Sequence, residues 1–132
     1  MFSVSFSWRR PDYLGVKDGR LAPPKRTPNC VSSQADPADA EHYIEPIAFH
    51  GSMSDLRRTV EAMRGATVIE ERPGYLYAEY RSPLFGFVDD VEFLFADGVL
   101  QVRSASRLGR RDFGVNRSRV EKLRRRLTAA PR

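Results

Sequence analysis

The chain has 132 residues, of which 41% are hydrophobic and 30% are charged, as is usual for one globular domain. These values exclude a largely disordered chain, and no apolar run approaches the roughly 20 residues of a membrane-spanning helix. The single cysteine, Cys30, excludes an internal disulfide framework and a cysteine-rich zinc site. The first ten residues contain no continuous apolar segment of the kind that a secretory signal needs, so the sequence predicts a cytoplasmic protein.

The net charge of +5 is unevenly distributed along the chain. Residues 100–132 hold eleven of the 22 Lys and Arg side chains and only two acids, a net charge of +9, whereas residues 1–99 carry −4. The ordinary explanation is a solvated helix face together with internal ion pairs. The alternative is an anionic partner, such as nucleic acid, a phosphate group or a membrane surface.

Residues 9–41 contain five of the nine prolines, with Gly, Ser, Asp and Asn between them. Because no hydrophobic periodicity survives there, residues 1–41 are predicted to form a long irregular arm that lies over the domain. Residues 42–128 are predicted to form the α+β core, and the whole of residues 1–132 is predicted to be a single domain.

The first regular element that the sequence predicts is a short strand at Tyr43–Phe49, where Pro46 suits a sheet edge. A helix follows, because Ser52 and Asp55 have the spacing of a capping box and Gly65 supplies a stop. Apolar residues recur between them at helical spacing: Met53, Leu56, Val60 and Met63.

Two hairpins and a second helix are expected next. Residues 66–72 and 75–82 flank the turn pair Pro73-Gly74, and residues 87–96 and 99–107 flank Asp97-Gly98, a strong hairpin signal. Asn116 is the expected cap of a last helix, in which an apolar stripe is formed by Val120, Leu123 and Leu127.

The predicted order is therefore β-α-β-β-β-β-α, which is an α+β fold. Each amphipathic helix must bury its apolar stripe, and an antiparallel sheet offers a face on which it can do so. We therefore expect an antiparallel sheet of about five strands with both helices on one face.

The Asp97-Gly98 turn also predicts which residues face each other across the second hairpin, starting from Ala96 opposite Val99. The pairs expected on one face are Phe95 with Leu100, Phe93 with Val102, Val91 with Ser104 and Asp89 with Ser106. This face is apolar near the turn and polar at the open end of the hairpin, where Asp89, Ser104 and Ser106 gather.

On the other face of that hairpin, Asp90 is expected opposite Ala105, and Glu92 opposite Arg103. The second pair predicts a cross-strand ion pair.

Polar residues collect in three segments, near residues 29–33, 88–92 and 103–119. They supply the candidate ligand-binding or polar-network residues, which are Asn29, Cys30, Ser32, Ser33, Asp89, Asp90, Glu92, Arg103, Ser104, Ser106, Arg107, Asp112, Asn116 and Arg119.

In the first segment, Cys30 would be a nucleophile if a histidine lay beside it. Nothing in the spacing connects His42 or His50 to it, so a buried, inert cysteine among turn-forming Asn and Ser residues is the ordinary explanation. In the second segment, carboxylates could bind a metal or act as a general acid and base. Because adjacent strand residues point to opposite faces, Asp89 and Asp90 do not suit one ion, and we expect no metal site.

In the third segment, arginines and hydroxyls near a helix N-terminus suit an anion. The alternative is a structural network in which Arg103 pairs with Glu92, and Arg107 with Asp89 or Asp112. The apolar loop between the hairpins, Ser82-Pro83-Leu84-Phe85-Gly86-Phe87, is interpreted as a lid, a docking patch or part of the core.

Four segments in a fixed order resemble the domain of unknown function 1499 family of bacterial and plastid proteins, over about Leu14 to Leu127. These segments are Leu21–Pro23 with Pro28–Gln34, Phe87–Phe93, Arg103–Arg107, and Asp112–Arg117 with Arg119-Val120. The resemblance implies a fold unit but no established activity. Family members often have a second cysteine where this chain has Pro24-Lys25, so a role that needs a cysteine pair does not transfer. Many relatives carry signal or membrane segments ahead of the domain, so their location does not transfer either.

From these observations we predict a non-enzymatic domain that binds a small anionic ligand or a protein partner at the open end of the sheet. Arg103, Arg107 and Arg119 would supply positive charge, and Asp89 and Asp112 would orient them.

Two other classes of function remain open, and no cofactor is expected with any of them. The first is an enzyme with Cys30 as nucleophile or Asp89 as general base. The second is nucleic-acid binding through Arg124–Arg126, which lacks the stacking aromatics that such binding favours.

Overall fold

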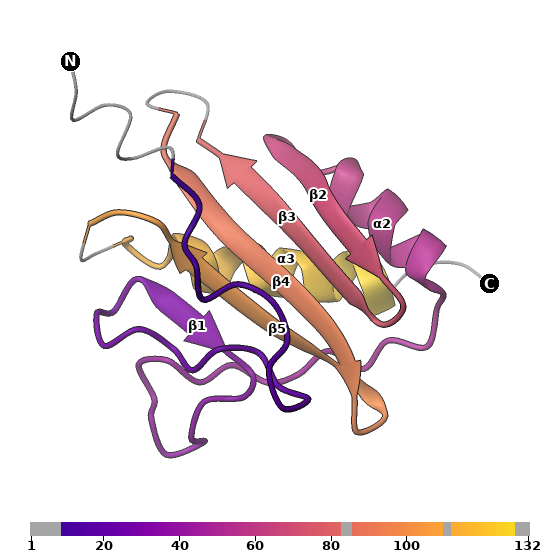
Figure 1. Cartoon of the computed structure of the whole chain (residues 1–132), viewed down its shortest axis with the longest axis horizontal. Helices are drawn as coiled ribbons and strands as arrows, with labels where there is room; N and C mark the ends of the chain where they lie inside the picture. The colour runs from indigo at the N-terminus through magenta and orange to yellow at the C-terminus, as the bar shows by residue number, and fades with distance from the viewer. Residues whose placement is uncertain (1–8, 83–85, 110–111, 129–132) are drawn as a thin grey trace.

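The computed structural model describes residues 9–82, 86–109 and 112–128. Five strands form one sheet in the order β1-β5-β4-β3-β2, and each neighbouring pair is antiparallel (Figure 1). The elements are β1 (Cys30–Ser32), α2 (Met53–Glu61), β2 (Ala66–Arg72), β3 (Tyr75–Arg81), β4 (Val88–Ala96), β5 (Val99–Ser106) and α3 (Val115–Thr128). The predicted fold class and the order β-α-β-β-β-β-α are confirmed.

The position predicted for the first strand, Tyr43–Phe49, is wrong. That segment makes only isolated bridges, from Tyr43 to Ser32 and from Ile47 to Leu100, and the first strand is β1, inside the predicted irregular arm. Pro46 has no N–H to donate, so the segment cannot extend a regular ladder. β1 has three residues, and such a short strand produces no alternation that a sequence pattern could show.

Both helices pack on the same face of the sheet, and they lie behind it in Figure 1. Leu56 and Val60 of α2 share one buried cluster with Val120, Leu123 and Leu127 of α3. The sheet contributes Leu76, Ala78, Tyr80, Val91, Phe93, Leu100 and Val102 to the same cluster. The predicted arrangement of the helices is therefore correct, since both apolar stripes are buried against the sheet.

The N-terminal arm crosses the opposite face of the sheet, in front of β4 and β5 in Figure 1. Its Leu21 is buried against Tyr75, Tyr77 and Leu94, and Leu14 packs at the margin of this second cluster. The sheet is therefore covered on both faces, by the helices on what we call the helix side and by the arm on what we call the arm side.

The β4–β5 hairpin has the predicted register, from Ala96 opposite Val99 to Asp89 opposite Ser106. Asp97 and Gly98 have φ values of 59° and 77°, which is the combination that a two-residue type I′ turn requires.

The helix caps are predicted correctly at α2 and incorrectly at α3. The backbone N–H of Asp55 donates to Ser52 Oγ and that of Ser52 donates to Asp55 Oδ2, both at 3.1 Å, which completes the capping box. Asn116, the expected cap of α3, is instead the second residue of the helix. Asp112 takes that role, since its carboxylate accepts the backbone N–H groups of Gly114 at 2.9 Å and Asn116 at 3.1 Å.

The fold predicts different effects for alanine at two glycines that share a φ of +80°, Gly65 and Gly74. Both substitutions place an L side chain in the left-handed region, at a cost of about 1 kcal/mol. A Cβ at Gly65 would also overlap the carbonyl oxygen of Arg81, whereas a Cβ at Gly74 would meet nothing within 4 Å. In urea unfolding we expect Gly65→Ala to lose about 1–3 kcal/mol more stability than Gly74→Ala. Equal losses would contradict the close approach of Gly65 to β3.

Candidate functional site

The predicted polar residues lie at the open end of the β4–β5 hairpin, but side-chain alternation divides them between the two faces of the sheet. Asp89 and Ser104 share the helix side with the buried core residue Val91. Asp90 and Arg103 point to the arm side. The predicted binding residues therefore form two polar clusters, one on each face, as the predicted register of the hairpin requires.

The cluster on the helix side is organised by Asn116, which is fully buried. Its side-chain amide donates to Asp112 Oδ2 at 2.7 Å, Ser106 Oγ at 2.9 Å and the backbone oxygen of Asn29 at 3.2 Å. Its amide oxygen accepts a bond from Ser104 Oγ at 2.6 Å. One side chain thus fastens the start of α3 to β5 and to the residue that precedes β1.

Arg119 completes this cluster and is neutralised within it. Its Nη2 lies 2.7 Å from Asp89 Oδ2, and both side chains are 13% exposed. Its Nη1 donates to Asn116 Oδ1 at 2.9 Å and Ser104 Oγ at 3.2 Å, and the guanidinium lies 4.7 Å from the centre of the Tyr80 ring. These contacts form a closed network on the helix side.

On the arm side, Arg107 pairs with acids other than the predicted Asp89 or Asp112. It donates to Asp90 Oδ1 at 2.6 Å and to Glu79 Oε2 at 2.9 Å, because residue 107 continues the alternation that places 103 and 105 on this face. Burial acts to lower the pKa of Arg107, but the two carboxylates outweigh it and raise that pKa above its usual value.

Glu92 and Arg103 face each other as predicted, yet they form no ion pair within 4.0 Å in the part of the chain that the structure describes. Glu92 Oε2 instead accepts the Gly15 backbone N–H at 2.7 Å and the Tyr75 hydroxyl at 2.6 Å. Burial raises the pKa of Glu92, although these two donors act to lower it.

The guanidinium of Arg103 is held by the arm. It donates to the carbonyl oxygen of Pro23 at 3.0 and 3.3 Å and lies 4.5 Å from the centre of the Tyr13 ring. The predicted Glu92–Arg103 ion pair is therefore wrong, because the arm supplies a separate partner to each side chain. Three buried polar atoms beneath the arm have no hydrogen-bond partner: Arg103 Nη1, Glu92 Oε1 and the Tyr13 hydroxyl oxygen. Each could still form a hydrogen bond.

Cys30 and the two histidines do not form a catalytic arrangement. Cys30 is fully buried, and burial raises the pKa of its thiol. His42 contacts Asp39 Oδ2 at 2.7 Å and the Thr27 carbonyl oxygen at 2.9 Å through its two ring nitrogens, and His50 is exposed.

The remaining predicted polar residues have structural contacts. Ser32 Oγ accepts the Gln34 backbone N–H at 3.1 Å, and Ser33 Oγ donates to Gln101 Oε1 at 2.7 Å. Asn29 donates from its side chain to the Gly109 carbonyl oxygen at 2.6 Å. These bonds fix β1 and its flanks to β5 and to the loop that follows it.

Two classes of site have no candidate among the described residues. Residues 9–82, 86–109 and 112–128 contain no group of three or more His, Cys, Asp or Glu side chains that could hold a metal ion. Within the same ranges, no helix has the length and apolarity to cross a membrane.

Parts of two predicted features lie outside the described residues: Pro83, Leu84 and Phe85 of the apolar loop, and Arg110 and Arg111 of the third segment.

A pocket of about 330 Å³ opens on the arm side at the open end of the hairpin. Its lining is strongly basic and consists of Arg9, Arg10, Pro11, Asp12, Tyr13, Lys25, Arg107 and Leu108. Lys25 Nζ donates to the Ser106 carbonyl oxygen at 2.5 Å, and no described carboxylate lies within 4.0 Å of it. Burial lowers the pKa of this ammonium. Sequence reasoning missed Lys25 because it lies among prolines with no periodicity to place it.

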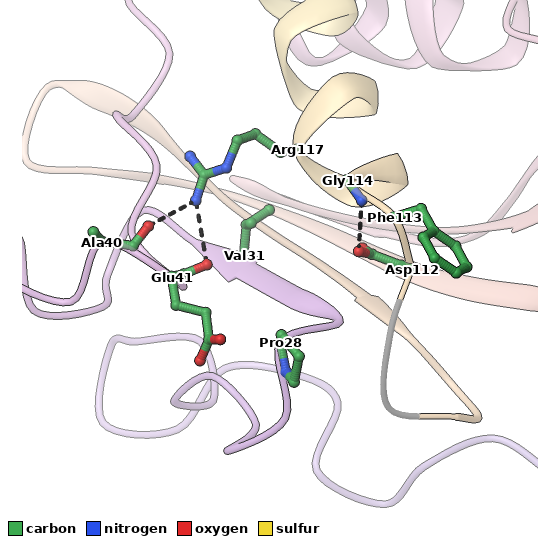
Figure 2. Close-up of a pocket in the computed structure, with 8 residues that line it drawn as sticks. All are labelled: Pro28, Val31, Ala40, Glu41, Asp112, Phe113, Gly114 and Arg117. Carbon is green, nitrogen blue, oxygen red and sulfur yellow. Dashed lines mark hydrogen bonds between the residues drawn. The ribbon is translucent and has the colours of Figure 1, made fainter.

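A second pocket, of about 350 Å³, lies where the arm meets the start of α3 (Figure 2). Arg117 Nη2 donates there to the carbonyl oxygens of Ala40 and Glu41, each at 3.3 Å. Figure 2 shows the Phe113 ring directed away from Arg117, and Phe113 is 94% exposed.

Comparison with protein families gives a match over residues 20–127 to DUF1499, which is described as a protein of unknown function. The chain belongs to the DUF1499 family. No significant match was found among curated proteins or among solved structures. The resemblance inferred from the four polar segments is therefore confirmed, and the family adds no activity to it.

The buried ion pair between Arg107 and Asp90 on the arm side predicts a large loss of stability in this DUF1499 domain when Arg107 is replaced. We expect Arg107→Met to lose about 3 kcal/mol in denaturant unfolding, because it leaves the buried Asp90 carboxylate without its cation. Arg72→Met is the matched control, since Arg72 pairs with Glu70 at side-chain exposures of 71% and 40%. The control should lose less than about 1 kcal/mol. Similar losses in the two variants would show that the buried pair contributes no more than a surface pair.

The environment of Cys30 predicts an unreactive thiol. In the native protein at neutral pH we expect no labelling by iodoacetamide, because the thiol is fully buried and its pKa is raised. Labelling should appear only as the protein unfolds in denaturant. Rapid labelling of the folded protein would revive the nucleophile hypothesis.

Proposed function

We propose that this domain is a non-enzymatic binding module that takes a small anionic ligand into the basic pocket at the open end of the sheet. The observation that supports it most directly is Lys25, a partly buried ammonium whose hydrogen-bond acceptor is the backbone carbonyl oxygen of Ser106. A charged group that has lost part of its hydration is stabilised by an opposite charge, and an anion in this pocket would provide one.

In this proposal, the three arginines that the sequence predicted as ligand contacts have a structural role, because each already has a partner within the protein. Arg103 is held by Pro23 and Tyr13, and Arg119 by Asp89. Arg107 lines the pocket, but Asp90 and Glu79 balance its charge. The uncompensated positive charge therefore comes from Lys25, with exposed Arg9 beside it in the pocket lining.

The two alternative classes have less support from the geometry. An enzyme would need an accessible nucleophile or base, and Cys30 is buried while Asp89 is paired with Arg119. For nucleic-acid binding through α3, Arg124 is already engaged by the Glu121 carboxylate and the Pro46 carbonyl oxygen. Arg125 and Arg126 are exposed, but α3 offers no aromatic side chain on which a base could stack.

The proposal is tested by titrating the whole chain with inorganic phosphate and following backbone amide shifts by NMR. We expect saturable shifts around Lys25 and Leu108, and a dissociation constant roughly tenfold weaker in Lys25→Gln, since one charged hydrogen bond is lost. Lys122→Gln removes an exposed lysine of α3 and serves as the charge-matched control.

The melting temperature of each variant establishes that it is folded. The proposal fails if no saturable shifts appear at the pocket, or if Lys122→Gln weakens binding as much as Lys25→Gln does.

A further inference from the structure

Three exposed apolar side chains belong to the connection between β5 and α3, at the open end of the sheet: Leu108, Phe113 and Val115, which we call the apolar tip. They are 38%, 94% and 48% exposed. Leu108 follows β5, while Phe113 precedes α3 and Val115 is its first residue. The segment is anchored beneath the tip, because Asn29 donates to the Leu108 carbonyl oxygen at 3.3 Å.

Phe113 is held in a conformation that displays its ring to solvent. Its φ of 54° lies in the left-handed region, which L side chains other than Asn and Asp rarely adopt. The Asp112 carboxylate fixes the flanking backbone by accepting the N–H groups of Gly114 and Asn116. Within the chain the ring gains almost no burial from this strained geometry, so its exposure calls for an explanation outside the fold.

A cationic side chain lines each of the two pockets to which the apolar tip contributes. Leu108 shares its pocket with Lys25, and Phe113 shares the other pocket with Arg117. The acceptors of these two cations are backbone carbonyl oxygens, so neither charge is neutralised by a described carboxylate within 4.0 Å. The opposing charges in these pockets are Asp12 in the Lys25 pocket and Glu41 and Asp112 in the Arg117 pocket. The Asp112 carboxylate is hydrogen-bonded at the start of α3.

We propose that the apolar tip docks on an anionic membrane surface, with Phe113 and Leu108 entering the headgroup region and Lys25 and Arg117 contacting lipid phosphates. An aromatic and aliphatic protrusion with flanking basic side chains has the chemistry that binds an interface of this kind. A tip of three side chains is small against the roughly 800 Å² that each partner buries in a stable protein interface. A fluid headgroup layer needs no complementary surface and accepts such a protrusion.

This inference rests on the proposed function, and it assigns the anion of the Lys25 pocket to a lipid headgroup. Free phosphate and a phospholipid share the chemistry that Lys25 would recognise. They differ because only the lipid brings an apolar layer for Phe113.

The test is co-sedimentation of the whole chain with vesicles of phosphatidylcholine alone and with vesicles that also contain phosphatidylglycerol. We expect binding to the second kind only, weakening as salt is added. Phe113→Asn removes the ring with a residue that tolerates the left-handed region, and it should lower vesicle partitioning roughly tenfold with unchanged melting. Val16→Asn is the matched control, because Val16 is 45% exposed and lies in the arm away from the tip. It should bind as the wild type does.

Several results would overturn the inference: no binding to phosphatidylglycerol vesicles, equal binding by Phe113→Asn, or self-association that Phe113→Asn abolishes in the absence of lipid. Binding of free phosphate at Lys25 without vesicle binding would support the proposed small-anion function and contradict membrane docking. Vesicle binding that depends on Phe113, without any binding of free phosphate, would support the membrane and reject the small-anion function.

Discussion

Alternation of side chains along the β4–β5 hairpin is the constraint on which the arrangement of this domain depends. The Asp97-Gly98 turn sets the register, and the register directs Asp89 to the helix side and Asp90 to the arm side. Each acid then selects a different arginine, Arg119 from α3 and Arg107 from the end of β5. Of two adjacent residues, Asp89 therefore joins α3 to the sheet, while Asp90 joins β4 to the end of β5 on the arm side.

The arm takes part in this electrostatic arrangement as well as covering the sheet. Its backbone provides the Gly15 N–H to Glu92 and the Pro23 carbonyl oxygen to Arg103, so each of these buried side chains is hydrogen-bonded to a peptide group of the arm. Three arginines of the basic C-terminal third, Arg107, Arg119 and Arg124, have an acidic partner. Lys25 and Arg117 have only carbonyl oxygens as acceptors at the open end of the sheet. Arg125 and Arg126 of α3 are exposed, with no described carboxylate within 4.0 Å.

Features of the fold that depend on interactions between residues close in the sequence could be predicted from local sequence patterns. The hairpin register and the capping box at Ser52 depend on residues two to three positions apart, and both could be predicted. The three-residue β1 could not, because its pairing partner lies more than 70 residues away and its own sequence has no periodicity. The partners of Arg103 and Lys25 are about 80 residues distant, and these two contacts run to or from an arm without regular structure. No sequence pattern encodes such contacts.

The contrast between buried or paired side chains and accessible side chains indicates which kind of function the geometry favours. Catalysis requires a nucleophile or base that can reach a substrate, and the two candidates that the sequence offered do not meet this requirement: Cys30 is buried and Asp89 is paired with Arg119. Among the groups that stay accessible or have no carboxylate partner at the open end are Lys25, Arg117 and the Phe113 ring. Such groups bind rather than react, since a cation attracts an anion and an exposed ring partitions into an apolar layer. The buried and paired residues at this end of the sheet stabilise the fold, and the exposed cations and aromatic ring are the groups on which the proposed binding function rests.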